Sequence, residues 1–338
     1  MEPTSRLGVV IPVLNEAEHL PLLLEDLLGQ DLEPERFVVM ILDGGSMDQT
    51  EAMAREALAT APFEVLHVAN TERTVPYARN LALELLPPDV DLLVELIGHV
   101  RIPHDHLRLR LTSWQKAVES HGEGLAAVGV RVNGPDRVAS ATERWIDGAL
   151  RSALGSGGGQ FARFDRLEST KVPAFATHRR TAVASIGGWD VRWSTSQDSD
   201  LSMRLLKAGF VLLRDPSLTV NMARRSTLTS HWRMSVRYGY WRGRLLRHHP
   251  SRADPREFAP LFGALLSLLL YLTAPATALW PIIAYAASIG TVGAIASISS
   301  RRVGGLFGVP LALCMLHTGF TIGLLRSLIG WAPTSKDR

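Results

Sequence analysis

The chain has 338 residues, of which 46% are hydrophobic and 20% are charged, and its formal net charge at pH 7 is +3. This balance excludes a disordered or collagen-like protein, and the length predicts about two structural units. The single cysteine, Cys314, excludes an intrachain disulfide framework and a cysteine-based zinc site. The small net charge does not by itself imply a nucleic acid partner, and we expect none.

Strand and helix patterns alternate over the first hundred residues. Apolar runs of strand length occur at 8–13, 37–42, 64–68 and 91–96, and helical spacing of leucines or alanines follows the first three. Asn15 with Glu18, and Ser46 with Gln49, have the spacing of capping boxes, which predicts that Asn15 and Ser46 cap the first two helices. Alternation of this kind predicts an α/β fold with a mostly parallel sheet covered by helices on both faces.

Polar residues follow the predicted strands at the edge where such sheets bind ligands. Asn15, Asp43 and the pair Gly98-His99 all occupy such positions. Pro-Val-Leu-Asn-Glu follows the first strand instead of a glycine-rich loop, which argues against a dinucleotide-binding or P-loop protein. Asp43 precedes Gly44, so its alternative role is that of a turn residue.

A later segment predicts a helix that begins near Asp198. Leu201 and Leu205 give this helix a buried face, and Gly209 ends it. Asp200 and Arg204 stand four residues apart and are expected to pair.

A basic segment follows, because no acidic residue occurs between Asp215 and Asp254. Tryptophan and tyrosine side chains interleave eight arginines in this segment, a composition that suits the headgroup layer of an anionic membrane. The arginines are Arg224, Arg225, Arg233, Arg237, Arg242, Arg244, Arg247 and Arg252. We therefore expect residues 223–257 to form amphipathic basic helices that contact anionic lipids.

The C-terminal part, residues 258–326, is expected to cross a membrane about three times. Residues 258–300 and 303–325 contain no Asp, Glu, Lys or Arg, and about 20 apolar residues suffice for one span. By the positive-inside rule, the basic segment and everything before it are cytoplasmic, Arg301 and Arg302 return to that side, and the tail after the third span lies outside. We therefore expect a multi-pass protein of the inner membrane. Small residues such as Gly290 and Gly293 would permit a homo-oligomer through these helices.

Three motifs in this order resemble family-2 glycosyltransferases of the GT-A fold. They are Val-Ile-Pro-Val-Leu-Asn-Glu at 10–16, Asp-Gly-Gly-Ser-Met-Asp-Gln-Thr at 43–50, and Gly-Gly-Trp-Asp at 187–190 followed by Gln-Asp-Ser-Asp-Leu-Ser-Met-Arg-Leu at 197–205. The resemblance implies a Rossmann-like GT-A domain over residues 1–222. With the basic segment and the spans, the whole chain is similar to the membrane-anchored branch that includes the succinoglycan-type glucosyltransferases of bacterial exopolysaccharide synthesis.

The resemblance also implies roles for individual residues. It makes Asp198 the base that takes the proton of the acceptor hydroxyl; the alternative is a carboxylate that caps the helix. It places the nucleotide-sugar donor against six residues, and the phosphates of a polyprenyl-linked acceptor against four arginines, which bind phosphate well. The donor residues are Pro12, Asn15, Glu16, Asp43, Ser46 and Gly98, and the acceptor residues are Arg224, Arg225, Arg237 and Arg242.

One position departs from the family pattern. Ile97 stands where the family has a metal-binding Asp, in a branch whose usual motif is Asp-Gly-His. His99 remains as a candidate ligand for Mn²⁺ or Mg²⁺, and Glu95 lies on the same strand face as Ile97. The alternative for His99 is a structural hydrogen bond.

Three functions are compatible with these observations. The first is an inverting glycosyltransferase that moves a hexose from a nucleotide-diphosphate sugar, expected to be UDP-linked, to a lipid-linked acceptor in cell-surface polysaccharide or glycolipid synthesis. The second, a polyprenyl-phosphate sugar synthase, differs in its acceptor. The third is a GT-A membrane scaffold that has lost catalysis, for which Ile97 is the argument.

Overall fold

The computed structural model describes residues 5–156, 161 and 164–332. The chain folds into two compact units: Met1–Asp136 with Phe164–Ala223, and Arg137–Arg163 with Arg224–Arg338. Residues 137–163 thus group with the C-terminal part, although the sequence motifs assign them to the first 222 residues. The reason is an apolar helix face, since Ile146 and Ala149 pack against Val309 and Leu313 near the C-terminus.

The first unit contains a mixed sheet with the strand order β3-β2-β1-β4-β8-β6-β9-β5, and β7 pairs with β9. The strands are β1 (Arg6–Val13), β2 (Phe37–Asp43), β3 (Glu64–Ala69), β4 (Val90–Glu95), β5 (Val100–Arg101), β6 (Leu125–Asn133), β7 (Glu168–Ser169), β8 (Thr177–Arg179) and β9 (Val211–Met222). Strands β1 to β4 are parallel, as the alternating pattern predicts. Beyond β4 the sheet is mixed, because β8 runs antiparallel to both β4 and β6.

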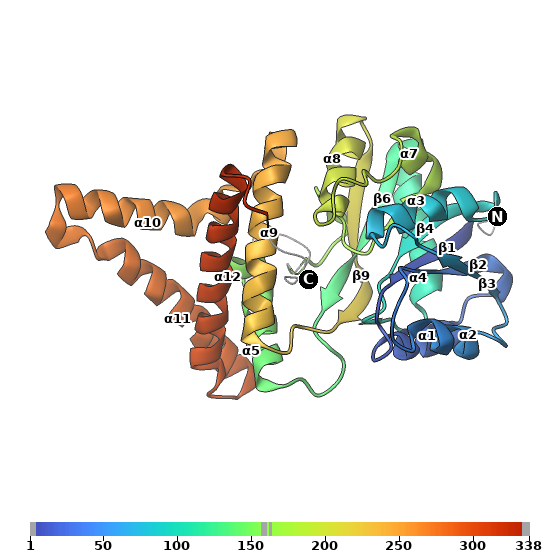
Figure 1. The fold of residues 1–338 in the computed structure, drawn as a ribbon, viewed down its shortest axis with the longest axis horizontal. Helices are drawn as coiled ribbons and strands as arrows, with labels where there is room; N and C mark the ends of the chain where they lie inside the picture. Colours follow the sequence, from blue (N-terminus) through green and yellow to red (C-terminus); the bar gives the residue numbers. More distant parts are fainter. Residues whose placement is uncertain (1–4, 157–160, 162–163, 333–338) are drawn as a thin grey trace. The chain divides into compact units, whose positions relative to one another are not determined.

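Helices cover both faces of this sheet, as predicted (Figure 1). Val10, Met40 and Leu42 face a core that also contains buried residues of α3, α7 and α8. The intervening strand residues point the other way, and α1 and α2 lie on that side. The helices of this unit are α1 (Leu20–Leu28), α2 (Thr50–Ala57), α3 (Val75–Leu85), α4 (His106–His121), α7 (Arg180–Ser185) and α8 (Gln197–Lys207).

The second unit is helical. Its helices are α5 (Ala141–Arg151), α6 (Ala153–Ser156), α9 (Leu228–His248), α10 (Pro255–Thr273), α11 (Trp280–Ser300) and α12 (Gly305–Leu328). Three segments are long and apolar enough to cross a membrane: Pro255–Thr273, Pro275–Ser300 and Gly305–Leu328. The expected three apolar helices are therefore confirmed. The turn between the first two contains the 3₁₀ helix Pro275–Thr277, which begins with a proline just after α10 ends.

Candidate active site

The carboxyl ends of the parallel strands bring the predicted donor residues to one edge of the sheet. Val13 at the end of β1 is in register with Asp43 at the end of β2, and Val10 is in register with Glu95 at the end of β4. The segments that follow these three strands carry Asn15, Glu16, Ser46 and Gly98. The other two residues of the predicted donor set end the strands themselves: Pro12 is the penultimate residue of β1 and Asp43 is the last residue of β2.

The loops after β1 and β2 are fastened to each other by hydrogen bonds. The Asn15 backbone N–H donates to Ser46 Oγ at 2.9 Å, and the Met47 N–H donates to Asn15 Oδ1 at 2.8 Å. Asn15 has a left-handed backbone with φ of 55°, which asparagine tolerates well. The predicted caps are therefore wrong: His19 and Gln49 precede α1 and α2 without a side-chain cap, because Asn15 and Ser46 bond to each other's loops.

Asp43 closes the turn after β2. Its carboxylate accepts hydrogen bonds from the backbone N–H groups of Gly45 and Ser46 at 3.1 and 3.0 Å, and from the Ser46 hydroxyl. A second carboxylate, Asp48, fastens the same loop to the β1 loop by accepting from Ala17 N–H at 3.2 Å. The hydroxyl hydrogen bond from Thr50 lowers the pKa of Asp48. Both carboxylates thus hold the loops in a defined conformation.

Glu16, Gly98 and His99 lie together where the β1 and β4 loops meet. Glu16 Oε1 lies 2.9 Å from His99 Nδ1. A Cβ atom at position 98 would lie 3.0 Å from the Glu16 side chain, so glycine allows this close approach. Side-chain exposure is 20% for Glu16 and 35% for His99, which leaves both reachable by a ligand.

The Glu16–His99 pair supplies two side chains of the kinds that bind divalent metals. Within residues 5–156, 161 and 164–332, no group of three or more His, Cys, Asp or Glu side chains could hold a metal ion. Glu95 cannot add a ligand, because it is 4% exposed and already lies 3.2 Å from both Arg79 and His178. Glu16 and His99 still fit a divalent ion that takes its remaining ligands from donor phosphates, an arrangement common for Mg²⁺; the imidazole favours Mn²⁺.

Asp198 lies in the first turn of α8 and forms an ion pair with Arg79 of α3. Arg79 is 5% exposed, and its other terminal nitrogen lies 3.2 Å from Glu95. The Asp198 side chain is 45% exposed, so one side of the carboxylate remains open. Asp198 does not cap α8: Ser196 is the N-cap residue, and its side chain forms no capping hydrogen bond.

The charges around Asp198 act on its pKa in opposite directions. Partial removal from water and the negative charge of Glu95 raise the pKa of Asp198, and Arg79 opposes the rise. For Glu95, burial favours the neutral acid, but Arg79, His178 and Arg110 outweigh it and lower its pKa. Glu95 thus stays ionised and holds Arg79, while Asp198 is a stronger base than an ordinary aspartate.

The Gly-Gly-Trp-Asp motif at 187–190 packs against Arg79 and Asn80 of α3. Asn80 forms two hydrogen bonds with the Trp189 backbone. The Trp189 N–H donates to Asn80 Oδ1 at 2.8 Å, and Asn80 Nδ2 donates to the Trp189 C=O at 2.7 Å. The Trp189 ring lies 5.7 Å from the Arg79 guanidinium carbon. Gly187 and Gly188 both have left-handed backbones, with φ of 79° and 72°, so the motif needs glycine twice.

The structure places Asp200 away from this chemistry. Asp200 is buried and accepts a hydrogen bond from Arg204 Nε at 2.8 Å, which confirms the expected pair. Arg204 also donates to the C=O groups of Ile186 and Gly188, so the pair fastens α8 to the glycine motif.

Sequence reasoning did not identify Arg79, Asn80 or His178. The signal for Arg79 was present, because Arg79 falls on the same helix face as the buried Ala78 and Ala82. A charged residue on an apolar helix face needs a buried partner.

The four predicted acceptor arginines belong to the second unit and have separate surroundings. Arg224 is buried, lies 2.8 Å from Asp147 of α5, and has its pKa lowered by burial. Arg242 lies 3.4 Å from Glu257, and burial lowers its pKa to about 10. Arg225 is exposed, and Arg237 lies beside the Tyr238 ring.

The family model Glycosyl transferase family 2 matches residues 8–152, and Glycosyl transferase family group 2 matches residues 102–325. The chain is 30% identical over 330 residues to the succinoglycan biosynthesis protein ExoA of Rhizobium meliloti, covering 95% of this chain and 94% of that one.

Two further similarities are weaker. A dolichyl N-acetyl-α-D-glucosaminyl phosphate 3-β-D-2,3-diacetamido-2,3-dideoxy-β-D-glucuronosyltransferase of Methanococcus voltae is 24% identical over 244 residues, 71% of this chain and 74% of that one. The mannosyltransferase PcManGT of Pyrobaculum calidifontis, solved with GDP-mannose and Mn²⁺, superposes with a TM-score of 0.60 at 18% identity, over 96% of this chain and 87% of that one. The last likeness shows the GT-A fold, and the family models with the ExoA relative show that the chain belongs to glycosyltransferase family 2.

Proposed function

We propose that the protein is an inverting hexosyltransferase that uses a nucleotide-diphosphate sugar, with UDP as the nucleotide, and a lipid-linked acceptor. The observation that carries this proposal is the Asp198 carboxylate, half-exposed at the start of α8 and held from behind by the buried Arg79–Glu95 pair. A base needs this combination of a fixed position and a raised pKa.

In the proposed reaction, Asp198 accepts the proton of the acceptor hydroxyl while that oxygen attacks the anomeric carbon of the donor sugar. The new C–O bond forms as the bond from the anomeric carbon to the diphosphate breaks, and the nucleoside diphosphate leaves with the bonding electrons. Attack opposite the leaving group inverts the anomeric configuration. Asp43, with the fastened loops that carry Asn15, Glu16 and Ser46, forms the proposed nucleotide site beside Pro12 and Gly98.

Glu16 and His99 are the proposed protein ligands of a divalent ion, Mn²⁺ in preference to Mg²⁺, which when bound neutralises charge on the departing diphosphate. Glu16 Oε1 and His99 Nδ1 lie 2.9 Å apart, close enough for both to bind one ion. Ile97 supplies no ligand, so these two side chains would carry the protein's part of the coordination.

The lipid-linked acceptor is supported by three helices long and apolar enough for a membrane and by the basic segment beside them. The name of the M. voltae relative describes an acceptor sugar carried on dolichyl phosphate. We propose that the catalytic unit lies on the cytoplasmic side of the inner membrane, because the basic residues flank the first apolar helix. Exposed Arg225 and the arginines of α9 are the proposed contacts to anionic lipid and acceptor phosphates.

The decisive experiment measures transfer and UDP binding by the same variants. Asp198→Asn should lower kcat by about 10²-fold or more and leave the UDP affinity nearly unchanged, because the base acts only on the acceptor. Asp91→Asn, an exposed carboxylate on β4, is the matched control. Turnover retained in Asp198→Asn would remove Asp198 as the base.

A second arm separates an enzyme from a scaffold. Ile97→Asp should strengthen Mn²⁺-dependent UDP binding in calorimetry, because it adds a carboxylate two residues from His99, and Ile97→Asn should not. An absence of UDP binding by the wild-type protein with either metal would favour the scaffold.

A further inference from the structure

Helix α9 lies along α12, and the two helices run in the same direction (Figure 1). Near one end of the contact, His231 Nε2 donates to the C=O of Ala312 at 3.1 Å. At the other end, Arg247 donates to the C=O of Ser327 at 2.6 Å. Residues 312–327 of a helix span about 22 Å at 1.5 Å per residue. The contact therefore covers most of the length that a crossing helix would need.

Glycines bring the two backbones into direct contact. A Cβ atom at Gly239 of α9 would lie 2.0 Å from the C=O oxygen of Phe320, and one at Gly323 of α12 would lie 2.1 Å from that of Val236. Helices packed this closely through small residues form a fixed pair. Helix α9 must therefore have the same depth and tilt in a membrane as α12.

The arginines of α9 restrict that position. Arg233, Arg237 and Arg244 recur at helical spacing on one stripe, and Arg233 and Arg244 are exposed. From Arg233 to Arg247 the helix extends about 21 Å. If α12 crossed the hydrocarbon core, which is about 30 Å thick, several of these guanidinium groups would lie inside it. Ionised arginines avoid that environment strongly.

A second polar helix packs on the other half of α12. Trp145 of α5 fills a notch in α12, since a Cβ atom at Gly308 would lie 2.1 Å from its ring. Two residues after Trp145, α5 carries Asp147, which pairs with Arg224. Charged helices thus accompany α12 at both ends, and both are connected directly to the first unit.

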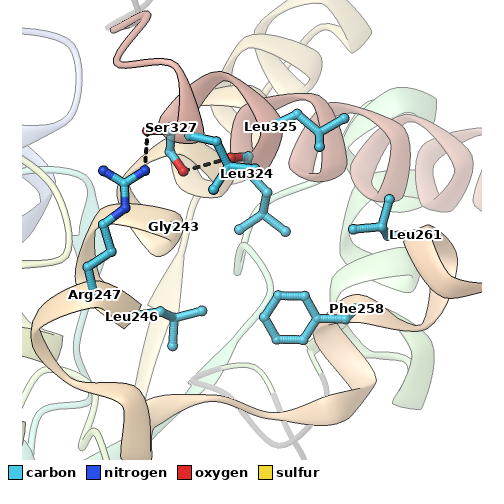
Figure 2. A pocket seen from close by; sticks show the side chains of 9 residues that line it. Gly243, Leu246, Arg247, Phe258, Leu261, Leu324, Leu325 and Ser327 are labelled. Carbon is cyan, nitrogen blue, oxygen red and sulfur yellow. Dashed lines mark hydrogen bonds between the residues drawn. The ribbon is translucent and has the colours of Figure 1, made fainter.

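The face of α12 that these helices leave open is apolar. Its exposed large apolar side chains are Leu306, Phe307, Leu311, Ile322, Leu325 and Leu328. Figure 2 shows the edge of this layer, where Leu246, Phe258, Leu261 and Leu324 line a groove of about 280 Å³ and Arg247 lies beside it, bonded to Ser327. Apolar surface next to a guanidinium group suits the boundary between headgroups and acyl chains.

Helices α10 and α11 differ from α12 in this respect. In the most apolar 18-residue stretch of each of these two segments, only 6% is buried within the protein, against 39% in α12. Their charged residues stand at the ends: Arg256 and Glu257 in the first turn of α10, and Arg301 directly after α11. Between these ends neither helix carries a charged residue. Helix α11 also packs on α12, since a Cβ atom at Gly293 would lie 2.6 Å from Pro310, but no arginine accompanies it.

We propose that only α10 and α11 cross the bilayer, and that α12 lies with α9 and α5 in the headgroup layer of an anionic membrane. The segment after α12 then remains on the side of the first unit. The prediction from the sequence alone, with a third crossing, places it on the opposite side. This topology does not depend on the transferase activity.

Cysteine labelling of the full-length protein in native membrane vesicles tests the proposal. In a Cys314→Ser background, single cysteines are introduced at Ala332 after α12, at Ala276 in the α10–α11 turn, and at Glu56 on the first unit. An impermeant maleimide is applied to right-side-out and to inverted vesicles. We expect cysteines at 332 and 56 to react in the same vesicle type and the cysteine at 276 to react in the other.

Labelling of position 332 together with position 276, or from both sides, would overturn the proposal. Trp331→Cys repeats the measurement one residue earlier, so that the result does not depend on a single substitution. Solubilisation in detergent before labelling confirms that each cysteine is reactive.

Discussion

Arg79 forms an ion pair with Asp198 and, through its other terminal nitrogen, lies 3.2 Å from Glu95. One buried guanidinium from α3 therefore connects the end of β4 to the start of α8, two elements that are far apart in the sequence. The arrangement fixes the position of the proposed base without surrounding it, since the Asp198 side chain remains 45% exposed.

Replacing Arg79 tests this connection. Arg79→Gln should lower the free energy of unfolding by about 3–5 kcal/mol, because it leaves the buried Glu95 charge without its closest partner. It should also move the acidic limb of the kcat/KM pH profile to higher pH, because Arg79 holds down the pKa of Asp198. Arg79→Lys keeps the charge and should shift the limb less. An unchanged profile in a folded Arg79→Gln variant would show that Arg79 does not act on the base.

Because its pKa is raised in the folded protein, Asp198 should lower the free energy of unfolding more at high pH than at low pH. Above the folded-state pKa the ionised group is held less favourably than in the unfolded chain, whose aspartate pKa is about 3.9. Asp198→Asn should therefore unfold at a higher temperature than the wild type at pH 7. The difference should disappear as the pH falls below the unfolded pKa, where both side chains are neutral. A melting temperature that drops at pH 7 would contradict the sign of the shift.

Two adjacent glycines offer a matched pair of substitutions. Gly187→Ala places a side chain on a left-handed backbone with nothing within 4 Å, so we expect a loss of about 1–2 kcal/mol. Gly188→Ala adds a clash, because its Cβ atom would lie 2.5 Å from Asn80 Oδ1, and should cost about 1–3 kcal/mol more. Denaturant unfolding of both variants measures the difference. Equal losses would mean that Asn80 can move away.

Arg224 and Arg225 are neighbours with opposite expected roles. Arg224→Gln should destabilise the protein by roughly 1–3 kcal/mol, because it removes the buried partner of Asp147. Arg225→Gln should change stability by less than about 0.5 kcal/mol and weaken the binding of anionic lipid to the detergent-solubilised protein, to which one surface arginine contributes about 1 kcal/mol. Thermal melts and titration of anionic lipid into the detergent-solubilised protein separate the two effects. A destabilised Arg225→Gln variant would assign that side chain to the fold.

The strands, the order of the motifs and the three apolar helices could be predicted because each depends on local patterns. The Asp200–Arg204 pair belongs to the same class, since four residues on a helix fix the distance. The caps at Asn15 and Ser46 could not be read in this way. Both residues have the composition of N-caps, but the neighbouring loop competes for the same hydrogen-bonding groups, and that competition depends on the pairing of β1 with β2.

The network behind Asp198 required the three-dimensional fold for the same reason. Glu95 reads as the end of an apolar strand, and His178 comes from β8, which no local pattern joins to β4. The assignment of α5 was equally inaccessible, because its apolar spacing predicts a buried face but not which helix covers it.

Helix α5 depends on a helix far downstream in the sequence, because Trp145 packs against Gly308 of α12. A shortened chain that stops at residue 257 would retain every motif of the transferase family, yet Trp145, Ile146 and Leu150 would lose their cover from α12. Such a truncated enzyme would expose an apolar stripe in the middle of its sequence and would aggregate. Extraction of the complete chain with detergent is the appropriate route to an active preparation.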